Sequence, residues 1–303
     1  MGVDLNLFKL LIVLRSKVQV PFGRCLTVGR QQIHFEASEA RAAWQAMRCN
    51  DFANQSGFEY GEYCEKLLAH LGATSVDSID ASDYEGATIV HDLNKPLPAS
   101  LSGRFDTVID FGTIEHVFDV PQVLRTYASL VSDGGTILIA TQADGSCGHG
   151  FYQFSPELFY RFFSQKDGFE TKCFLVPCGS SRRSWIFSPD PASSNSRIEF
   201  PVLGKTYVAA IAKRHGALGT FDKVQQSDYT VLWNHNAVTF YTRQRFQLPA
   251  KMLSLTRPIY TSAKKWLRDT ALGHAAERGL KLRLLPIKRF KPEDFPDYRS
   301  LNA

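Results

Sequence analysis

The chain has 303 residues, of which 44% are hydrophobic and 21% charged, with a formal net charge of +5. These values are ordinary for a globular protein and exclude a disordered or fibrous chain. The six cysteines form no CxxC pair and no metal-ligand spacing, which excludes a disulfide scaffold and a zinc finger and favours a reduced, cytoplasmic protein.

The two ends of the chain differ from its middle. In residues 1–22, the apolar run Leu10–Leu14 is flanked by Lys9 and Arg15, is too short to span a bilayer and precedes no signal-peptidase site, so we expect a packed amphipathic helix. Residues 241–303 hold 14 Lys+Arg and 5 Asp+Glu, a local net charge of 14 − 5 = +9, which leaves 5 − 9 = −4 for the rest. The pattern at Ile259–Arg283 predicts a basic helical arm.

Between these ends, strands and helices alternate, which predicts βαβ units and a doubly wound, mostly parallel sheet. The expected strands are Arg24–Val28, Val76–Asp80, Ala87–Asp92, Phe105–Asp110, Thr136–Thr141, Glu170–Val176 and Thr206–Ala212. The expected helices are Glu36–Met47, Glu59–Leu71, Val120–Val131 and Pro156–Phe163. Residues 177–204, rich in Ser, Pro and Arg, read as an insertion or lid.

Three of the expected strands end in a carboxylate, namely Asp80, Asp92 and Asp110. In an open α/β sheet, ligands bind outside the carboxyl ends of the strands. Acids at that edge suit a ligand rich in hydroxyl and amino donors, not one rich in phosphates. No G-x-G-x-x-G follows the first strand, which argues against a dinucleotide.

The order of these elements resembles class I S-adenosylmethionine (SAM) dependent methyltransferases from Gly23 to Arg214. Phe105–Asp110 with the following Glu115-His116-Val117 is similar to the family's fourth-strand signature, and Asp133-Gly-Gly135 opens a strand like its fifth. The segment Gly148-His-Gly-Phe-Tyr-Gln-Phe-Ser-Pro-Glu157 resembles a bacterial subgroup associated with sugar or secondary-metabolite clusters. The resemblance implies a Rossmann-like, seven-stranded mixed sheet in residues 23–240, after the N-terminal helix and before a basic C-terminal arm.

The resemblance also implies a cofactor site for SAM. Asp80 matches the acid that binds both ribose hydroxyls, Asp92 the acid that binds the adenine amino group, and Gly29 a glycine beside the methionine moiety. Asp110 is expected near the sulfonium or the SAM amino group, with a cap on the next turn as the alternative. The first loop departs from the family: Thr27 stands where an acid is usual, Gly29 is the only glycine retained, and Arg30 and Gln31 fill positions usually taken by small residues. Thr27 and Gln31 are expected to hydrogen-bond the amino-acid end of SAM.

An acceptor hydroxyl needs a base, and the loop after the fifth strand lies where that base belongs. His149, between Gly148 and Gly150, is the predicted base; the alternative is a histidine that only holds the loop. Glu115 and His116 are expected to order the turn into the next helix. Tyr152, Arg183 and Trp185 are predicted to line the acceptor pocket. No metal is expected, because Asp144 and His149 find no third ligand at a convincing spacing.

The expected function is SAM-dependent O-methylation of a small molecule or glycan. The alternative is a catalytically degenerate methyltransferase-like scaffold, which the depleted first loop favours. The basic arm is expected to pack on its own domain or to attract an anionic membrane surface, so the protein is placed in the cytoplasm, with the inner face of the membrane as the alternative location. The basic arm contains no recognised nucleic-acid-binding motif, so nucleic acid is not an expected partner.

Overall fold

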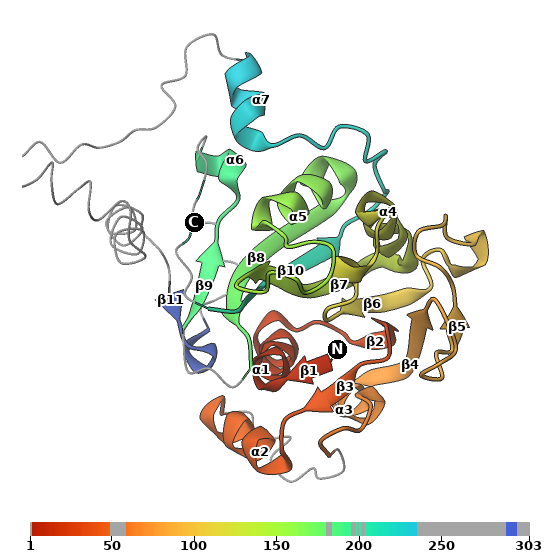
Figure 1. Ribbon diagram of the computed structural model, residues 1–303, viewed down its shortest axis with the longest axis vertical. Helices are drawn as coiled ribbons and strands as arrows, with labels where there is room; N and C mark the ends of the chain where they lie inside the picture. The colour runs from red at the N-terminus through yellow and green to blue at the C-terminus, as the bar shows by residue number, and fades with distance from the viewer. Residues whose placement is uncertain are drawn as a thin grey trace, which may run out of the picture. The chain divides into compact units, whose positions relative to one another are not determined.

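The computed structural model describes residues 2–48, 59–179, 184–194, 198, 200, 204–234 and 289–295. Its centre is a nine-stranded mixed sheet with the order β11-β9-β8-β10-β7-β6-β2-β4-β5 (Figure 1). The five strands from β7 to β5 are parallel, and the four from β11 to β10 pair antiparallel with their neighbours. The strands are β2 (Gly23–Val28), β4 (Ala73–Asp80), β5 (Ile89–Val90), β6 (Phe105–Asp110), β7 (Val131–Asp144), β8 (Phe169–Pro177), β9 (Trp185–Ser188), β10 (Thr206–Arg214) and β11 (Arg289–Phe290).

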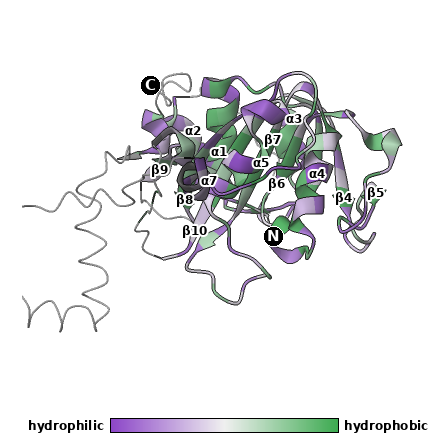
Figure 2. Ribbon diagram, turned by 90° about the horizontal axis from the view of Figure 1, so that it is seen from above, coloured by the Kyte–Doolittle hydropathy of each residue, from purple (hydrophilic) through white to green (hydrophobic). Residues whose placement is uncertain are grey.

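Helices cover both faces of this sheet, as the alternation of elements predicts (Figure 1). On one face, α1 (Leu5–Val13), α2 (Ala37–Ala46) and α3 (Glu65–His70) enclose the main core, which includes Cys25, Ile109 and Leu138 of the central strands. On the other face, α4 (Val120–Leu130) contacts β6 and β7, and α5 (Pro156–Phe162) contacts β8 and β10. The hydropathy colours of Figure 2 show that β6 and β7 are mostly apolar, as strands buried on both faces must be.

Most expected elements are confirmed to within a few residues, and their ends carry the expected caps. Ser155 Oγ accepts a hydrogen bond from Glu157 N at the start of α5, and Gly72 follows α3 with a φ of +102°. The helix expected from Glu59 begins only at Glu65. Residues 59–64 instead hydrogen-bond to the short strand β3 (Gln32–His34), through Gly61 N to Ile33 O at 2.8 Å.

The expected count of seven strands is wrong, because β9 and β11 extend the antiparallel edge. β9 lies in the segment interpreted as an insertion, and β11 lies in the C-terminal arm. Trp185, predicted to bind substrate, is the first residue of β9 and is fully buried, with Phe290 of β11 opposite it. It therefore belongs to the core and offers no surface to an acceptor.

The N-terminal helix is confirmed, but it is part of the sheet domain. β1 (Gly2–Asp4) pairs in parallel with β3. Asp4 Oδ1 caps α1 by accepting from Asn6 N and Leu7 N at 2.9 Å, while its Oδ2 accepts from Gly179 N at 2.6 Å beyond β8. Residues 1–190, 203–226 and 289–303 form one compact unit, so the expected boundary at residue 22 does not separate domains.

Residues 191–202 and 227–288 form a second unit. Its described helices are α6 (Pro191–Ser194) and α7 (Ser227–Asn234), and in α7 the rings of Tyr229 and Trp233 stack with centroids 6.1 Å apart. The predicted basic helix Ile259–Arg283 lies outside the described residues. Among those that are described, none of the helices combines the length and apolar character needed to cross a bilayer.

Candidate functional site

The strand order reverses direction between β2 and β6. From β2 the chain continues to β4 and β5 on one side, and then crosses to β6 and β7 on the other. The loops that follow β2 and β6 therefore diverge, and the carboxyl ends of these two strands form the crevice where ligands bind in such sheets. Gly29 follows β2 and Thr113 lies in the loop after β6, so both stand at this point.

The loop after β2 turns sharply at Gly29, whose φ is +68°. Gly29 N donates to Ile79 O at 2.8 Å, and Thr113 Oγ1 donates to Val28 O at 2.8 Å, so the loop is held from both neighbouring strands. A Cβ atom added at Gly29 would lie 2.8 Å from Thr113 Oγ1 and 3.8 Å from Asp80 Oδ2. The glycine thus keeps an open cradle beside the Asp80 carboxylate.

We expect Gly29→Ala to lower the free energy of unfolding by about 2–3 kcal/mol, because it adds left-handed backbone strain and a collision with Thr113. Gly103→Ala is the matched control, since Gly103 has a φ of +64° but nothing within 4 Å of its Cβ position. That control should cost only about 1 kcal/mol. Equal costs in urea unfolding of the two variants would show that Thr113 yields without penalty.

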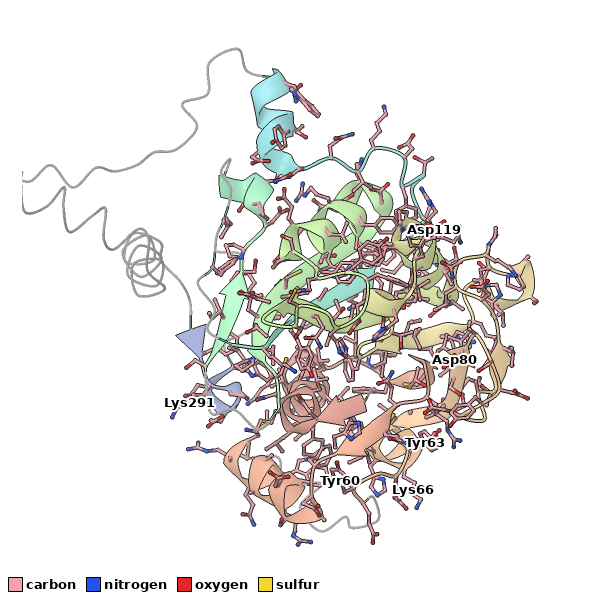
Figure 3. The ribbon with its side chains drawn as sticks, viewed as in Figure 1. Tyr60, Tyr63, Lys66, Asp80, Asp119 and Lys291 are labelled. Atoms are coloured by element: carbon pink, nitrogen blue, oxygen red, sulfur yellow. The ribbon has the colours of Figure 1, made fainter. Side chains whose placement is uncertain are left out.

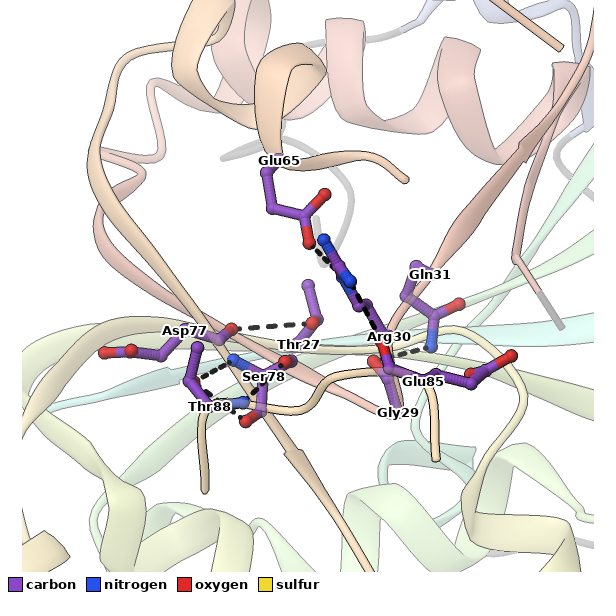
Figure 4. Close-up of polar contacts among 9 residues, drawn as sticks. All are labelled: Thr27, Gly29, Arg30, Gln31, Glu65, Asp77, Ser78, Glu85 and Thr88. Atoms are coloured by element: carbon purple, nitrogen blue, oxygen red, sulfur yellow. Dashed lines mark hydrogen bonds and ion pairs between the residues drawn. The ribbon is translucent and has the colours of Figure 1, made fainter. Parts of the chain in front are cut away.

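Two polar side chains of the first loop are buried. Gln31 Nε2 donates to Val28 O at 2.7 Å, whereas Gln31 Oε1 is buried and finds no donor among the described residues. Thr27 Oγ1 lies 3.5 Å from Asp77 O within the sheet, and its side chain is buried (Figure 4). Contrary to the prediction, Thr27 presents no group to a ligand, and Gln31 is the loop residue with an acceptor to spare.

Asp80 ends β4 beside Gly29 (Figure 3). Its Oδ1 accepts from Ala81 N at 2.6 Å, and its Oδ2 accepts no hydrogen bond from the described residues. The side chain is half-buried. A carboxylate oriented by its own backbone, with one oxygen left over, is suited to binding a hydroxyl donor.

Asp92 lies beyond β5 and is already engaged by its own turn. Its Oδ1 accepts from Asn94 N at 3.0 Å and from Asn94 Nδ2 at 2.9 Å, and Lys95 Nζ lies 3.5 Å from its Oδ2. These donors lower the pKa of Asp92, with the Asn94 side chain as the largest cause. The turn holds Asp92 as an anion that can accept a further donor.

Arg30, next to Gly29, links the loops on both sides of it. Its Nε donates to Glu65 Oε1 at 2.6 Å and its Nη1 donates to Glu85 O at 2.9 Å (Figure 4). The guanidinium also lies 3.8 Å from the centre of the Tyr63 ring. Arg30 therefore fixes the loop after β4 against α3, and these three partners occupy its guanidinium group.

Asp110, predicted to contact the cofactor, is instead the cap of the turn after β6. Its Oδ1 accepts from Thr113 N at 2.7 Å, and its Oδ2 accepts from Ile114 N at 3.0 Å and from Tyr127 OH at 2.7 Å. The residue is fully buried and both of its carboxylate oxygens already accept hydrogen bonds, so neither is left for a ligand. Burial raises the pKa of Asp110 to about 7, the charge of Glu115 adds to the rise, and the three hydrogen bonds oppose it.

This pKa makes the stability of the fold depend on pH. Between the unfolded value near 4 and about 7, the folded chain holds a proton on Asp110 that the unfolded chain has lost, so stability falls as pH rises through this range. We expect the stability of the wild type relative to Asp110→Asn to fall by on the order of 2–4 kcal/mol between pH 4 and pH 8.

The control for this pH series is Asp106→Asn on the same strand. Hydrogen bonds from Arg24 lower the pKa of Asp106 to about 2, so its contribution should stay constant above pH 4. Chemical unfolding followed at several pH values measures both differences. If the free energies of unfolding of the wild type and Asp110→Asn changed in parallel between pH 4 and pH 8, Asp110 would be ionised in the folded chain across this range.

The loops after β6 and β7 bring together a second group of polar residues. Glu115 and His116 belong to the 3-10 turn Ile114–His116, and His149 comes from the loop after β7. His149 Nε2 lies 3.7 Å from Glu115 Oε1, and the ring centres of His116 and His149 are 5.0 Å apart. Glu115 is fully buried and accepts from Thr141 Oγ1 at 2.6 Å, while both histidines are exposed.

Desolvation shifts two pKa values of this group in opposite directions. It raises the pKa of buried Glu115, and it lowers the pKa of His116 although that side chain reaches the surface; the charge of His149 also lowers the pKa of His116. The expectation for Glu115 and His116 is that they order the turn, with substrate contact by His116 as the alternative. Their adjacency after the strand was visible in the sequence, but nothing in the spacing indicated that His149 would join them.

The residues predicted to line the acceptor pocket do not lie together in the structure. Tyr152 lies on the loop after β7, and its hydroxyl donates to Phe118 O at 2.9 Å. Exposed rings of Phe118 and Phe151 stand beside it, 6.2 Å apart between centroids. Arg183 lies outside the described residues, and Trp185 is in the core. The aromatic group on the loop that carries His149 is therefore Phe151 and Tyr152, with Phe118 against them.

Comparison with protein families gives the evolutionary context of this site. A family model described as a methyltransferase domain matches residues 37–189, half of the chain. The protein belongs to this methyltransferase family. The matched segment includes Asp80, Asp92 and His149 but starts after the loop that holds Gly29. A search of curated proteins finds no match.

A search of solved structures finds several similar chains at low sequence identity. The 1,6-didemethyltoxoflavin N1-methyltransferase of Burkholderia thailandensis is 12% identical, with 70% of this chain and 78% of that chain covered and a TM-score of 0.36. The YcgJ protein of Bacillus subtilis is 13% identical, with 69% and 98% covered and a TM-score of 0.33. A SAM-dependent methyltransferase of Mesorhizobium loti is 15% identical, with 71% and 74% covered and a TM-score of 0.24. Because these sequence identities and TM-scores are low, the family assignment rests on the family model alone.

Proposed function

We propose that the protein binds SAM at the carboxyl ends of β2, β4 and β5 and transfers its methyl group to an acceptor hydroxyl beside the loop after β7. Membership of a methyltransferase family supports the activity. The Burkholderia thailandensis protein was crystallised with bound S-adenosylhomocysteine, which is what SAM becomes after methyl transfer. The acceptor class we propose is a sugar, a glycan or a secondary metabolite.

The residues at the switch point fit this cofactor. Gly29 leaves a cradle that a Cβ would fill, Asp80 keeps a carboxylate oxygen without a donor, and Gln31 Oε1 is a buried acceptor without a partner among the described residues. SAM offers donors of the matching kinds, namely a ribose diol and an ammonium group. The pairing of Asp80 with the Gly29 cradle is the observation that carries the proposal.

Each residue has a distinct role in this scheme. Asp80 accepts from the ribose hydroxyls, Asp92 accepts from the adenine amino group, and Gln31 accepts from the ammonium group beside Gly29. The cofactor supplies a methyl group already activated by a positive sulfur. The chain then has to orient the acceptor and exclude water.

On the acceptor side, His149 is the residue that we propose to receive the acceptor proton. Its exposed ring belongs to the same loop as Phe151 and Tyr152, and Phe118 contacts Phe151; these aromatic faces suit a flat or sugar-like acceptor. Gly148 and Gly150 have φ values of +87° and +71°, so the backbone path around His149 depends on glycine.

Calorimetric titration of the full chain with SAM tests this proposal. We expect one SAM per chain and a thermal stabilisation that grows with SAM concentration. The scaffold alternative has a specific observation in its favour, because Arg30 stands where the family has a small residue and binds Glu65 and Glu85. Absence of heat and of thermal shift at millimolar SAM would contradict the proposal and favour the scaffold.

The basic arm 241–303 is proposed to bring the enzyme to an anionic membrane surface. The only described part of it is residues 289–295, in which β11 pairs with β9. Co-sedimentation with phosphatidylserine vesicles at low and high salt tests the idea, and absence of binding at low salt would contradict it.

A further inference from the structure

The side chains of Glu115, His116 and His149 form a cluster that the methyl-transfer scheme leaves largely unexplained. One ligand-type atom from each of the three lies within 4.8 Å of the other two. The nearest measured pair, Glu115 Oε1 and His149 Nε2, is 3.7 Å apart, which is beyond hydrogen-bond distance. The three groups converge without bonding to one another.

Glu115 is the unusual member of this cluster. Its side chain is fully buried, and its Oε2 is satisfied by Thr141 Oγ1. Its Oε1 is buried and accepts no hydrogen bond from the described part of the chain; its nearest partner is His149 Nε2 at 3.7 Å, an ion pair only when that ring is protonated. A buried carboxylate oxygen without a hydrogen-bond donor is costly, and a cation held between Glu115 and the two histidines would satisfy it.

We propose that Glu115, His116 and His149 bind a divalent first-row transition-metal ion. Two atoms that each lie about 2.1 Å from a tetrahedral ion are about 3.4 Å apart, close to the 3.7 Å between Glu115 Oε1 and His149 Nε2. The remaining gap closes by small rotations of the two exposed histidines, while buried Glu115 stays as the fixed ligand.

The backbone holds the two loops together at this point. Glu115 O accepts from Phe151 N at 2.7 Å, and a Cβ added at Gly150 would lie 2.7 Å from the same oxygen. The loop after β7 can therefore dock on the turn after β6 only because residue 150 is glycine. This docking fixes His149 beside His116, and it explains the Gly-His-Gly sequence independently of proton transfer.

The donor set selects the kind of ion. Two imidazole nitrogens and one carboxylate suit Zn²⁺, Mn²⁺, Fe²⁺ or Co²⁺, whereas Mg²⁺ and Ca²⁺ prefer oxygen ligands alone. Three protein ligands leave a position open for water or for an acceptor oxygen. That the open position serves the acceptor rests on the proposed function; the ion site itself does not. With the ion bound, His149 is a ligand; only in the ion-free chain is its ring available to receive the acceptor proton.

The experiment is a titration of the untagged full chain, stripped with a chelator, with Co²⁺ followed by visible absorption, and then with Zn²⁺ as competitor. We expect one Co²⁺ per chain, displaced by Zn²⁺. Glu115→Gln, His116→Ala and His149→Ala should each weaken Co²⁺ binding at least tenfold.

Two control variants keep the test specific. His215→Ala removes an exposed histidine that also lies 3.7 Å from a carboxylate, that of Glu170, but has no third ligand in the described residues. Cys147→Ser removes the exposed thiol two residues before His149. Both should bind Co²⁺ as the wild type does. Binding that is absent in the wild type, survives all three cluster variants, or is lost in a control would overturn the proposal.

The same samples separate this proposal from the proposed function. Asp80→Ala should keep Co²⁺ binding while it loses SAM affinity, and the cluster variants should keep SAM affinity while they lose Co²⁺. A chain that binds Co²⁺ through the cluster but never binds SAM would retain the metal site and contradict the methyltransferase activity. SAM binding without Co²⁺ binding would contradict only the metal site.

Discussion

Replacement of Asp80 by alanine should weaken SAM binding by at least about 100-fold, or roughly 3 kcal/mol or more. Two charge-assisted hydrogen bonds to the ribose hydroxyls would be lost, each worth about 1.5–3 kcal/mol. The fold should survive, because the side chain of Asp80 is only half-buried and accepts one hydrogen bond, from the neighbouring Ala81 N. Calorimetric titration of the folded variant with SAM measures this loss of affinity directly.

The matched control is Asp77→Ala, three residues earlier on β4. Asp77 lies 3.8 Å from Arg104 in a partly exposed pair, and its side chain has no part in the proposed site. SAM affinity should be unchanged in this variant, and partly exposed pairs of this kind contribute little to stability. If Asp80→Ala bound SAM as tightly as the control, the ribose would not lie at the end of β4.

Replacement of His149 by alanine should lower the methyl-transfer rate by about 100- to 1,000-fold and leave SAM affinity unchanged. General-base catalysis typically contributes a factor of this size, and loss of a metal ligand has a comparable effect. Both roles place His149 on the acceptor side of the site, away from Asp80 and Asp92. Single-turnover rates at saturating SAM, compared with SAM affinity, measure the separation.

His215→Ala serves as control here too, because it removes an exposed histidine that pairs with Glu170 on β8. The second variant to compare is His116→Ala. If His149 acts as the base, His116→Ala should retain most of the activity, whereas a shared metal ion requires both histidines. Full activity in His149→Ala would show that neither role applies and that His149 only holds its loop.

Local features of the chain explain how much of the cofactor side was predictable. The ends of β2 and β4 follow from apolar runs that stop at Gly29 and Asp80, and both residues stand where the prediction put them, at the carboxyl ends of two neighbouring strands. Asp110 also ends an apolar strand, but it caps the following turn and does not face the cofactor. The donors of that turn and Tyr127 of α4 surround its carboxylate. An acid at the end of a strand can bind a ligand only where the fold leaves one of its carboxylate oxygens without a hydrogen-bond donor.

Trp185 shows where local reasoning fails. Its surroundings are rich in Ser, Pro and Arg, which favoured a surface insertion. The structure instead pairs β9 with β8 and β11 with β9, and residue 290 lies more than a hundred positions away in the sequence. Burial of Trp185 depends on that distant partner, so no pattern in residues 177–204 could reveal it.

The alternation of strands and helices, the parallel half of the sheet and the acids at its carboxyl edge can all be predicted from the amino-acid order, because they follow from periodicity and from residues adjacent in the chain. Three features depend on the folded chain: which acids keep an oxygen without a donor, how many strands extend the antiparallel edge, and that Glu115 and His116 meet His149 from another loop. A convergent site depends on distances between loops, and those distances are set by how the strands pair and not by the spacing of residues along the chain.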